Sequence, residues 1–176
     1  MALAPDRASF NPTTPHQRRR AILKRTRRLP RLLTARPLPA GELPVLAAVL
    51  GAASLPTQDL DQPGREFFAF RDLRGTLVGY GGIEVVGADA LLRSVITVPE
   101  MRDRAYGMAI VDRMLALALR RGVHTLYLLT TTAVPFFERL GFAAIDRAEA
   151  PPTIAATREF ATYCSGSAVL MCRRLV

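Results

Sequence analysis

The sequence predicts an α/β domain in which a mixed central β-sheet is flanked by helices. Segments with strand-like and helix-like hydrophobic patterns alternate from about Thr34 to the end of the chain. Residues 104–121 repeat apolar side chains at helical spacing directly after a predicted β-hairpin, and residues 124–146 run strand, helix, strand, which favours partly parallel pairing. At 176 residues the chain has room for one such domain, predicted over 34–176, plus an appendage.

The first half of this domain is predicted to be one helix followed by antiparallel strands. Apolar side chains at helical spacing behind Pro44 predict the first helix. Alternating patterns separated by Gly and Asp turns predict the strands. The expected elements are a helix at 41–53, a loop at 55–64, strands at 66–71, 77–86 and 91–98, and turns at 73–76 and 87–89.

The second half is predicted to begin where Pro99 ends the strand pairing, since proline donates no N–H group. A helix at 104–121 follows, and Gly122 is placed to terminate it. The remaining expected elements are a strand at 124–130, a helix at 134–140, a strand at 142–146, a helix at 153–161 and a strand at 168–173.

Composition excludes several classes of protein. Hydrophobic residues make up 49% of the chain and charged residues 22%, which is enough apolar material for a core. No uncharged run reaches the ~20 apolar residues that span a bilayer. Cys164 and Cys172 are accompanied by only two histidines, so we expect neither a zinc ribbon nor a disulfide framework, and no metal. A reducing, cytoplasmic location is therefore expected.

The net charge of +9 resides in the first 36 residues. They hold ten of the 24 basic side chains and one of the 15 acidic ones, so the other 140 residues are neutral overall. Because phosphate recognition needs basic groups gathered on a folded surface, we do not expect nucleic-acid binding beyond nonspecific contacts of this arm. The arm, residues 1–33, is expected to be disordered by itself. It is either a dispensable extension or a tail for anionic partners, and it also resembles an organelle transit peptide.

The junction between residues 95 and 108 runs from a strand through a tight loop into a helix. Backbone N–H groups at a helix start lack intrahelical partners and lie at the positive end of the helix dipole. This arrangement predicts an anion site that holds a pyrophosphate without a metal. The alternative is a loop that merely starts a helix.

Two motifs in this chain resemble those of the GNAT N-acetyltransferase superfamily. The loop Arg102-Asp-Arg-Ala105-Tyr-Gly107 is similar to its acetyl-CoA loop, and Phe136-Phe-Glu-Arg-Leu-Gly-Phe142 is similar to the end of its fold. The resemblance implies the GNAT fold and acetyl-CoA as co-substrate. It assigns cofactor binding to Val95, Ile96, Thr97, Arg102, Asp103, Arg104, Ala105, Tyr106, Gly107 and Met108.

Three further stretches, 91–95, 126–133 and 159–168, resemble the bacterial arsenic-resistance N-acetyltransferases. This finer resemblance implies an amine-bearing arsenical or a related toxin as the acyl acceptor. It does not by itself imply that the protein binds arsenic.

Two positions depart from the family pattern. Ala105 replaces the first glycine of the loop. If this position needs a positive φ, the alanine methyl group crowds the pyrophosphate, whereas in ordinary helical geometry alanine has no cost. We expect weakened but retained binding. Phe137 stands where the family often has a tyrosine that protonates the leaving thiolate. Water, Thr131 or Thr132 then serves, or the thiolate leaves unprotonated, and Phe137 is expected to be a packing residue.

The implied reaction is attack of a neutral amine on the thioester carbonyl, and it needs two kinds of group. The resemblance places oxyanion donors at the backbone N–H groups around Ile96 and Thr97. Glu84 is the candidate general base because it is the acid inside the central hairpin and alternates with Ile83 and Val85. The alternative for Glu84 is a solvent-facing position near a strand end.

Other reactive residues are expected to be structural. His124 is interpreted as a surface or loop residue, and the two cysteines as structural, although thiolates also bind trivalent arsenicals. Arg93 either faces the substrate pocket, with a carboxylate as partner, or lies on the surface.

The leading functional hypothesis is an acetyl-CoA-dependent N-acetyltransferase for a small-molecule amine. The alternative is a degenerate GNAT fold that binds CoA as a regulator or interaction module, suggested by Ala105 and Phe137. The oligomeric state is left open, a homodimer being one option.

Overall fold

The structure, a computed structural model, describes residues 32–102, 105–163 and 167–176. The predicted basic arm up to residue 31 and the loop residues Asp103 and Arg104 lie outside this range. The predicted boundary at residue 34 falls just after Leu33, which is 4% exposed and belongs to the hydrophobic core.

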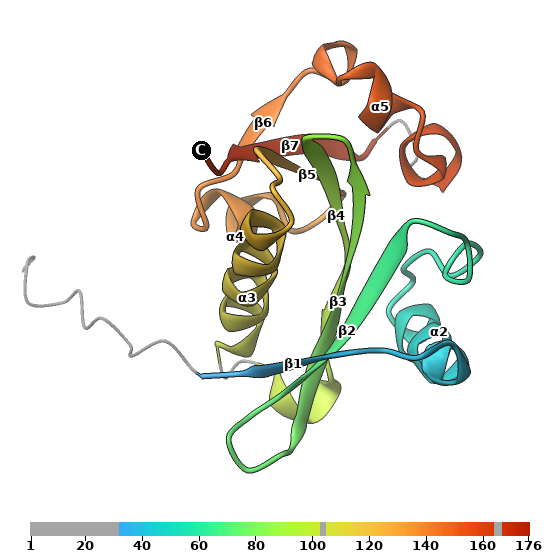
Figure 1. The fold of residues 1–176 in the computed structure, drawn as a ribbon, viewed down its shortest axis with the longest axis vertical. Helices are drawn as coiled ribbons and strands as arrows, with labels where there is room; N and C mark the ends of the chain where they lie inside the picture. Colours follow the sequence, from blue (N-terminus) through green and yellow to red (C-terminus); the bar gives the residue numbers. More distant parts are fainter. Residues whose placement is uncertain (1–31, 103–104, 164–166) are drawn as a thin grey trace, which may run out of the picture. The chain divides into compact units, whose positions relative to one another are not determined.

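A seven-stranded mixed sheet forms the centre of the domain (Figure 1). Its strand order is β1-β2-β3-β4-β5-β7-β6, and β4 and β5 are the parallel pair. The other neighbouring strands pair antiparallel. The strands are β1 (Thr34–Pro37), β2 (Arg65–Arg71), β3 (Leu77–Val86), β4 (Asp89–Thr97), β5 (Thr125–Thr130), β6 (Ala143–Ile145) and β7 (Val169–Arg174).

The helices connect these strands and cover the sheet on both sides. They are α2 (Leu43–Ala52), α3 (Tyr106–Arg120), α4 (Val134–Glu138) and α5 (Pro152–Ala155). Short 3₁₀ turns occur at Ala40–Glu42, Pro99–Met101 and Arg147–Glu149, and a π-helix at Glu159–Tyr163. Within the described range, no helix is long and apolar enough to cross a membrane.

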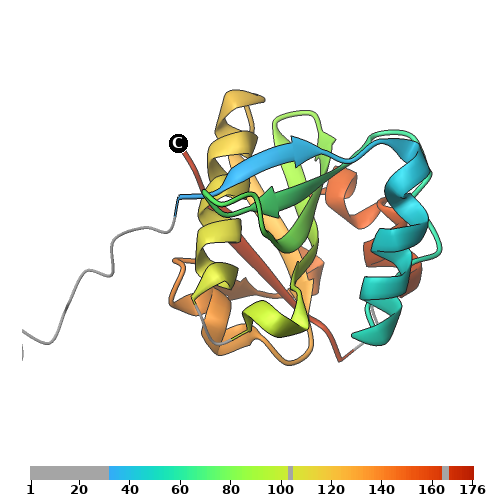
Figure 2. The same ribbon diagram turned by 90° about the horizontal axis from the view of Figure 1, so that it is seen from below.

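Helix α3 lies on one side of the sheet and α2 on the other (Figure 2). Because side chains alternate along a strand, β2 contributes side chains to the apolar clusters on both faces of the sheet. Phe68 and Phe70 belong to the cluster under α3, whereas Phe67 and Ala69 belong to the cluster under α2. The predicted α/β fold with a mixed sheet between helices is confirmed.

The α3 side holds an extensive apolar cluster. The helix buries Ile110, Met114 and Ala118 against the sheet, as its 3.6-residue periodicity predicts. Phe137 of α4 is 8% exposed and meets Phe142 edge to face, with ring centroids 5.6 Å apart. The expectation that Phe137 packs in the core is confirmed.

The structure differs from the prediction at three elements. Strand β1 was not expected, since its sequence Thr-Ala-Arg-Pro has no apolar alternation, yet it pairs with β2. Helix α3 begins at Tyr106 rather than 104, because Ala105 has a left-handed φ of 60°. The helix predicted at 153–161 is interrupted after α5, where the Thr157 hydroxyl donates to the carbonyl of Ile154 at 2.7 Å and competes with helical pairing.

Candidate active site

Strands β4 and β5 separate from one another after a short parallel contact. Their pairing covers Asp89–Leu91 against Thr125–Tyr127, after which β5 continues with β7 and β4 with β3. The β3–β4 register shifts between Tyr80 and Gly82, and Ser94 has a φ of 54°. A β-bulge bends the strand that carries it. Beyond Leu91 the edge of β4 has no strand partner on the β5 side among the described residues.

A cavity of about 940 Å³ occupies this separation. One wall consists of β4 and β5 with the loop after β5, and the opposite wall is the end of α2 with the loop that follows. Glu159 and Ala168 of the C-terminal segment also line it. Segments far apart in the sequence therefore meet at one binding-sized hollow.

Part of the predicted cofactor set lies on this cavity. Val95, Ile96, Thr97 and Arg102 line it. Ala105 to Met108 form the N-terminus of α3 next to it, where the ideal Cβ position on Gly107 is 3.6 Å from Thr97 Oγ1. The helix start thus adjoins the end of β4.

Ala105 occupies the N-cap of α3 with φ 60° and ψ 18°. A left-handed conformation strains any residue that carries a Cβ atom, by about 1–2 kcal/mol. The loop position therefore has the positive φ under which we expect the alanine methyl group to be unfavourable.

The residues around the cavity fit a ligand that carries phosphate groups. The first turn of α3, which includes Gly107, leaves backbone N–H groups without intrahelical partners at the positive end of a 15-residue helix. The guanidinium group of Arg102 adds a positive charge at the same end of the cavity. Peptide groups at the unpaired edge of β4 supply further hydrogen-bonding capacity.

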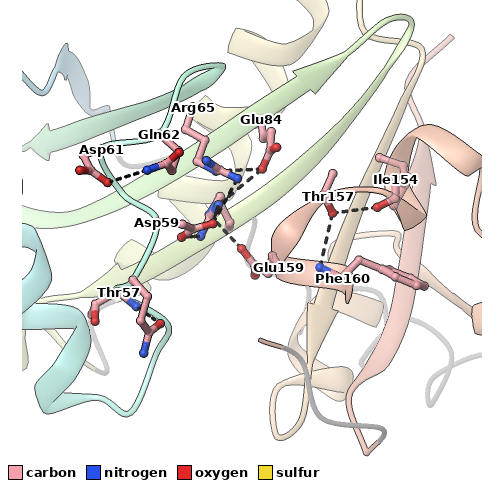
Figure 3. A network of polar contacts seen from close by, with 12 residues as sticks. Thr57, Asp59, Asp61, Gln62, Arg65, Glu84, Ile154, Thr157, Glu159 and Phe160 are labelled. Atoms are coloured by element: carbon pink, nitrogen blue, oxygen red, sulfur yellow. Dashed lines mark hydrogen bonds and ion pairs between the residues drawn. The ribbon is translucent and has the colours of Figure 1, made fainter. Parts of the chain in front are cut away.

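A buried charged cluster surrounds Arg93, in the middle of β4; Figure 3 labels its other members, Asp59, Arg65, Glu84 and Glu159. Arg93 contacts Asp59 through two nitrogens at 2.6 and 3.0 Å, Glu84 at 3.4 Å and Glu159 at 2.9 Å. Arg65 contacts Glu84 at 3.2 Å and Asp59 at 3.3 Å. All five side chains are at most 11% exposed.

The structure places Glu84 inside this cluster. It lies on the opposite face of β3 from Ile83, as its alternation predicts, but it does not line the cavity. The alternative of a solvent-facing glutamate is wrong, because Glu84 is 8% exposed and paired with Arg65 and Arg93. Its role as a base stays a prediction.

Arg93 faces the cavity and has carboxylate partners, so the alternative of a surface residue is wrong. The two terminal guanidinium nitrogens of Arg93 already donate to Asp59, so they are not free to bind the carboxylate of a ligand in the same bidentate way. The Nε contact with Glu159 is an ion pair rather than an aligned hydrogen bond.

Glu159 of this site was missed by the sequence analysis, as were Asp59 and Arg65 of the cluster. Glu159 belongs to the π-helix and lines the cavity, and burial raises the pKa of its carboxyl group to about 7, opposed by the nearby Arg93. In the sequence, residues 153–161 predict a helix and residues 159–168 resemble the arsenic-resistance subgroup, and neither pattern assigns Glu159 a role. A single acid in a predicted helix carries no signal of burial, which here depends on contact with β4.

The remaining candidates lie apart from the cavity. His124 is exposed, as expected. Its backbone N–H donates to the carbonyl of Ala88, and its carbonyl accepts from the N–H of Leu175. Cys172 of β7 is a half-buried free thiol whose pKa is raised by burial, while Cys164 lies outside the described residues.

Several solved structures resemble the described fold. N-acetylglutamate synthase from Neisseria gonorrhoeae, solved with coenzyme A and L-arginine, superposes with a TM-score of 0.65 at 19% identity. The match covers 81% of this chain and 33% of the synthase, so the chain spans about a third of that protein.

Two shorter proteins match over nearly their whole length. A GNAT-family acetyltransferase from Staphylococcus aureus has a TM-score of 0.64 and 15% identity, with coverage of 82% of this chain and 100% of the other. Spermidine N-acetyltransferase from Vibrio cholerae, solved with CoA and spermine, has a TM-score of 0.60 and 17% identity, with coverage of 81% and 95%. At these identities the likeness shows the fold.

No curated protein sequence matches the chain. The family model described as the acetyltransferase (GNAT) family, however, matches residues 36–142, which is more than half of the sequence. The match includes the separated strands, the start of α3 and the Phe136–Phe142 motif. On this evidence of sequence and fold together, the chain belongs to the acetyltransferase (GNAT) family.

Proposed function

We propose that this GNAT protein transfers the acetyl group of acetyl-CoA to the amine of a small molecule. The observation that carries the proposal is the cavity between β4 and β5, which is lined by Arg102, just before α3, and by Arg93 and Glu159 of the buried charged cluster. One end suits an anionic cofactor and the other a cationic acceptor.

The chain's own residues divide the work of binding. Arg102 and the first turn of α3 hold the pyrophosphate, and the β4 edge around Ile96 and Thr97 offers peptide N–H groups to the acyl oxygen. The bound cofactor supplies an acyl group activated as a thioester. Phe137 packs in the core, so a proton for the departing thiolate comes from water or from the Thr131 and Thr132 hydroxyls that line the cavity.

A small acceptor suits the site better than a protein substrate. The cavity is closed on several sides by α2, the sheet and the C-terminal segment, and the neutral body of the chain has no acidic run to line a peptide groove. The neighbour solved with spermine is an example of this fold acting on a small amine. The resemblance of 91–95, 126–133 and 159–168 to arsenic-resistance acetyltransferases places amine-bearing arsenicals and related toxins among the acceptors to assay. We also propose a cytoplasmic location, from the cysteine usage.

The test combines cofactor binding with thiol release. A thermal-shift titration with acetyl-CoA should raise the melting temperature, since a ligand that binds the folded state stabilises it by mass action. CoA-thiol release should then depend on an added amine, assayed across monoamines, polyamines, amino acids and amine-bearing toxins. A flat titration into the millimolar range would refute the cofactor assignment. Binding without thiol release for any amine would favour the CoA-binding regulator.

A further inference from the structure

We propose that Glu159 receives the ammonium group of the acyl acceptor in the cavity and takes its proton. This inference rests on the proposed function and names the acceptor as a cation at neutral pH. It assigns the proton-accepting role to Glu159 instead of Glu84.

The balance of buried charge indicates a cationic ligand. The cluster holds the carboxylates of Asp59, Glu84 and Glu159 against the guanidinium groups of Arg65 and Arg93, which leaves a net charge of −1 when all five are ionised. An unpaired buried charge is strongly unfavourable. An ammonium group in the cavity would balance the cluster, whereas a carboxylate would increase the imbalance.

Access distinguishes the three carboxylates. Glu159 lines the cavity, whereas Asp59 and Glu84 do not. Asp59 is engaged by both arginines, and Glu84 likewise contacts Arg65 and Arg93. One oxygen of Glu159 lies 2.9 Å from Arg93 Nε, in an ion pair that is not an aligned hydrogen bond. Glu159 is therefore the carboxylate that a ligand reaches.

Position along β4 places Glu159 near the expected reaction centre. Its partner Arg93 directly precedes Ser94, the residue with a left-handed φ in the β-bulge of β4. Ile96 and Thr97, which are assigned to the acyl oxygen, follow on the same strand and line the same cavity. The π-helix that carries Glu159 is a rare geometry that is enriched at functional sites.

Burial also suits Glu159 to a proton transfer near neutral pH. The pKa of its carboxyl group is raised to about 7 by desolvation, with Asp59 and Glu84 raising it and Arg93 and Arg65 lowering it. An alkylammonium resembles the lysine side chain, with a pKa of about 10.4, and is protonated in the cell. A base whose pKa lies near the working pH is effective in general base catalysis.

Acetyl transfer to an ammonium group removes two protons from its nitrogen. The ammonium N–H proton passes to a Glu159 oxygen, which frees the nitrogen lone pair for the acyl carbon of acetyl-CoA. The C–N bond forms and the C–S bond breaks, with the electron pair leaving on the thiolate. The second proton from nitrogen then goes to that thiolate or to water.

The decisive experiment compares Glu159→Gln with Glu84→Gln in the full chain. Glutamine retains a polar partner for Arg93 but accepts no proton, so Glu159→Gln should lower kcat/KM for the best amine by about 10²- to 10⁴-fold. It should also remove the rise of kcat/KM with pH through about 7 in the unmodified protein. Glu159→Asp should restore part of the rate. Glu66→Gln, at an exposed ion pair with Arg121, is the matched control and should leave the profile unchanged.

A second readout needs no turnover. In protein labelled at the glutamate carboxyl carbons, the NMR resonance that is absent from Glu159→Gln should titrate near pH 7. Adding n-butylamine should lower the midpoint of that titration, because an adjacent cation favours the carboxylate, whereas n-butanol should not.

The outcomes separate the two proposals. If Glu84→Gln lowers kcat/KM and removes its rise with pH, while Glu159→Gln changes neither, the inference is wrong and the proposed function stands. A midpoint that n-butylamine leaves unmoved also counts against Glu159. Failure of acetyl-CoA to bind would overturn the proposed function, whereas a shift with n-butylamine would still support Glu159 as the cation site.

Discussion

The two faces of the sheet are built on different principles. Under α3 the buried side chains form one continuous apolar cluster that runs from Leu33 to Met171. On the opposite face the described apolar residues divide into a cluster under α2 and another around Ile154 of α5, with the Asp59, Arg93 and Glu159 contacts also on that face. The first face stabilises the fold without regard to pH. On the second face, buried charged side chains take the place of part of the apolar packing, and the cavity lies on this face.

The largest expected effect comes from removing the central cation of the polar face. Arg93→Met leaves three buried carboxylates with one arginine, so the free energy of unfolding should fall by about 3–5 kcal/mol at pH 7.5. Chemical denaturation at pH 7.5 and pH 5 should show the loss shrinking on acidification, because burial raises the pKa of Glu159 to about 7 and protonation then removes one of the buried charges.

The matched change on the apolar face is Met114→Ala. It should lower the free energy of unfolding by about 2–5 kcal/mol through a cavity, equally at both pH values. An Arg93→Met loss that is the same at both pH values would show that the arginine acts by packing alone.

Next in size is the pH dependence that Glu159 contributes. The pKa of its carboxyl group is about 7 in the folded chain against 4.5 as the ordinary value. Because the folded state holds the proton more tightly, stability falls as pH rises from about 4.5 to 7. Glu159→Gln removes this pH dependence. The free energy of unfolding of the variant should therefore be higher than that of the unmodified protein by up to about 3 kcal/mol at pH 8, and the two values should be equal below pH 4.5. Equal stability across that range would contradict the burial of an ionisable Glu159.

A smaller effect is expected at the start of α3. Ala105→Gly relieves the left-handed strain and should raise the free energy of unfolding by about 1 kcal/mol. It should also tighten acetyl-CoA binding if the methyl group crowds the phosphate. Ala116→Gly, within the same helix, is the control and should destabilise by about 0.5–1 kcal/mol. Destabilisation by both substitutions would show that Ala105 is not strained.

The smallest effect belongs to an exposed ion pair. Arg121 contacts Glu66 through two nitrogens, with Nε at 2.8 Å, and Glu66 is 47% exposed. Glu66→Gln should change the free energy of unfolding by less than about 1 kcal/mol, because water and salt screen the pair. A loss comparable with that of Arg93→Met would erase the distinction between buried and exposed charge on which the comparison depends.

Local patterns predicted most of the elements, and long-range pairing accounts for those that were missed. The amphipathic stretch behind α3 and the alternation in β3 and β4 are properties of neighbouring residues, so they can be read along the chain. Strand β1 is a strand because β2 offers it a pairing edge, and Thr157 interrupts the last predicted helix through its own hydroxyl.

The sequence by itself determined the family, through the Arg102–Gly107 loop and the Phe136–Phe142 motif, together with the order of the elements and the packing role of Phe137. Only the tertiary structure decided which acids are buried and which one faces the cavity. Glu84 and Glu159 are 75 positions apart and each has ordinary neighbours in the chain, so their chemistry depends on Arg93, which the fold places beside both. Burial and charge pairing depend on distances through space rather than along the chain, and for that reason the sequence indicated Glu84 while the geometry points to Glu159.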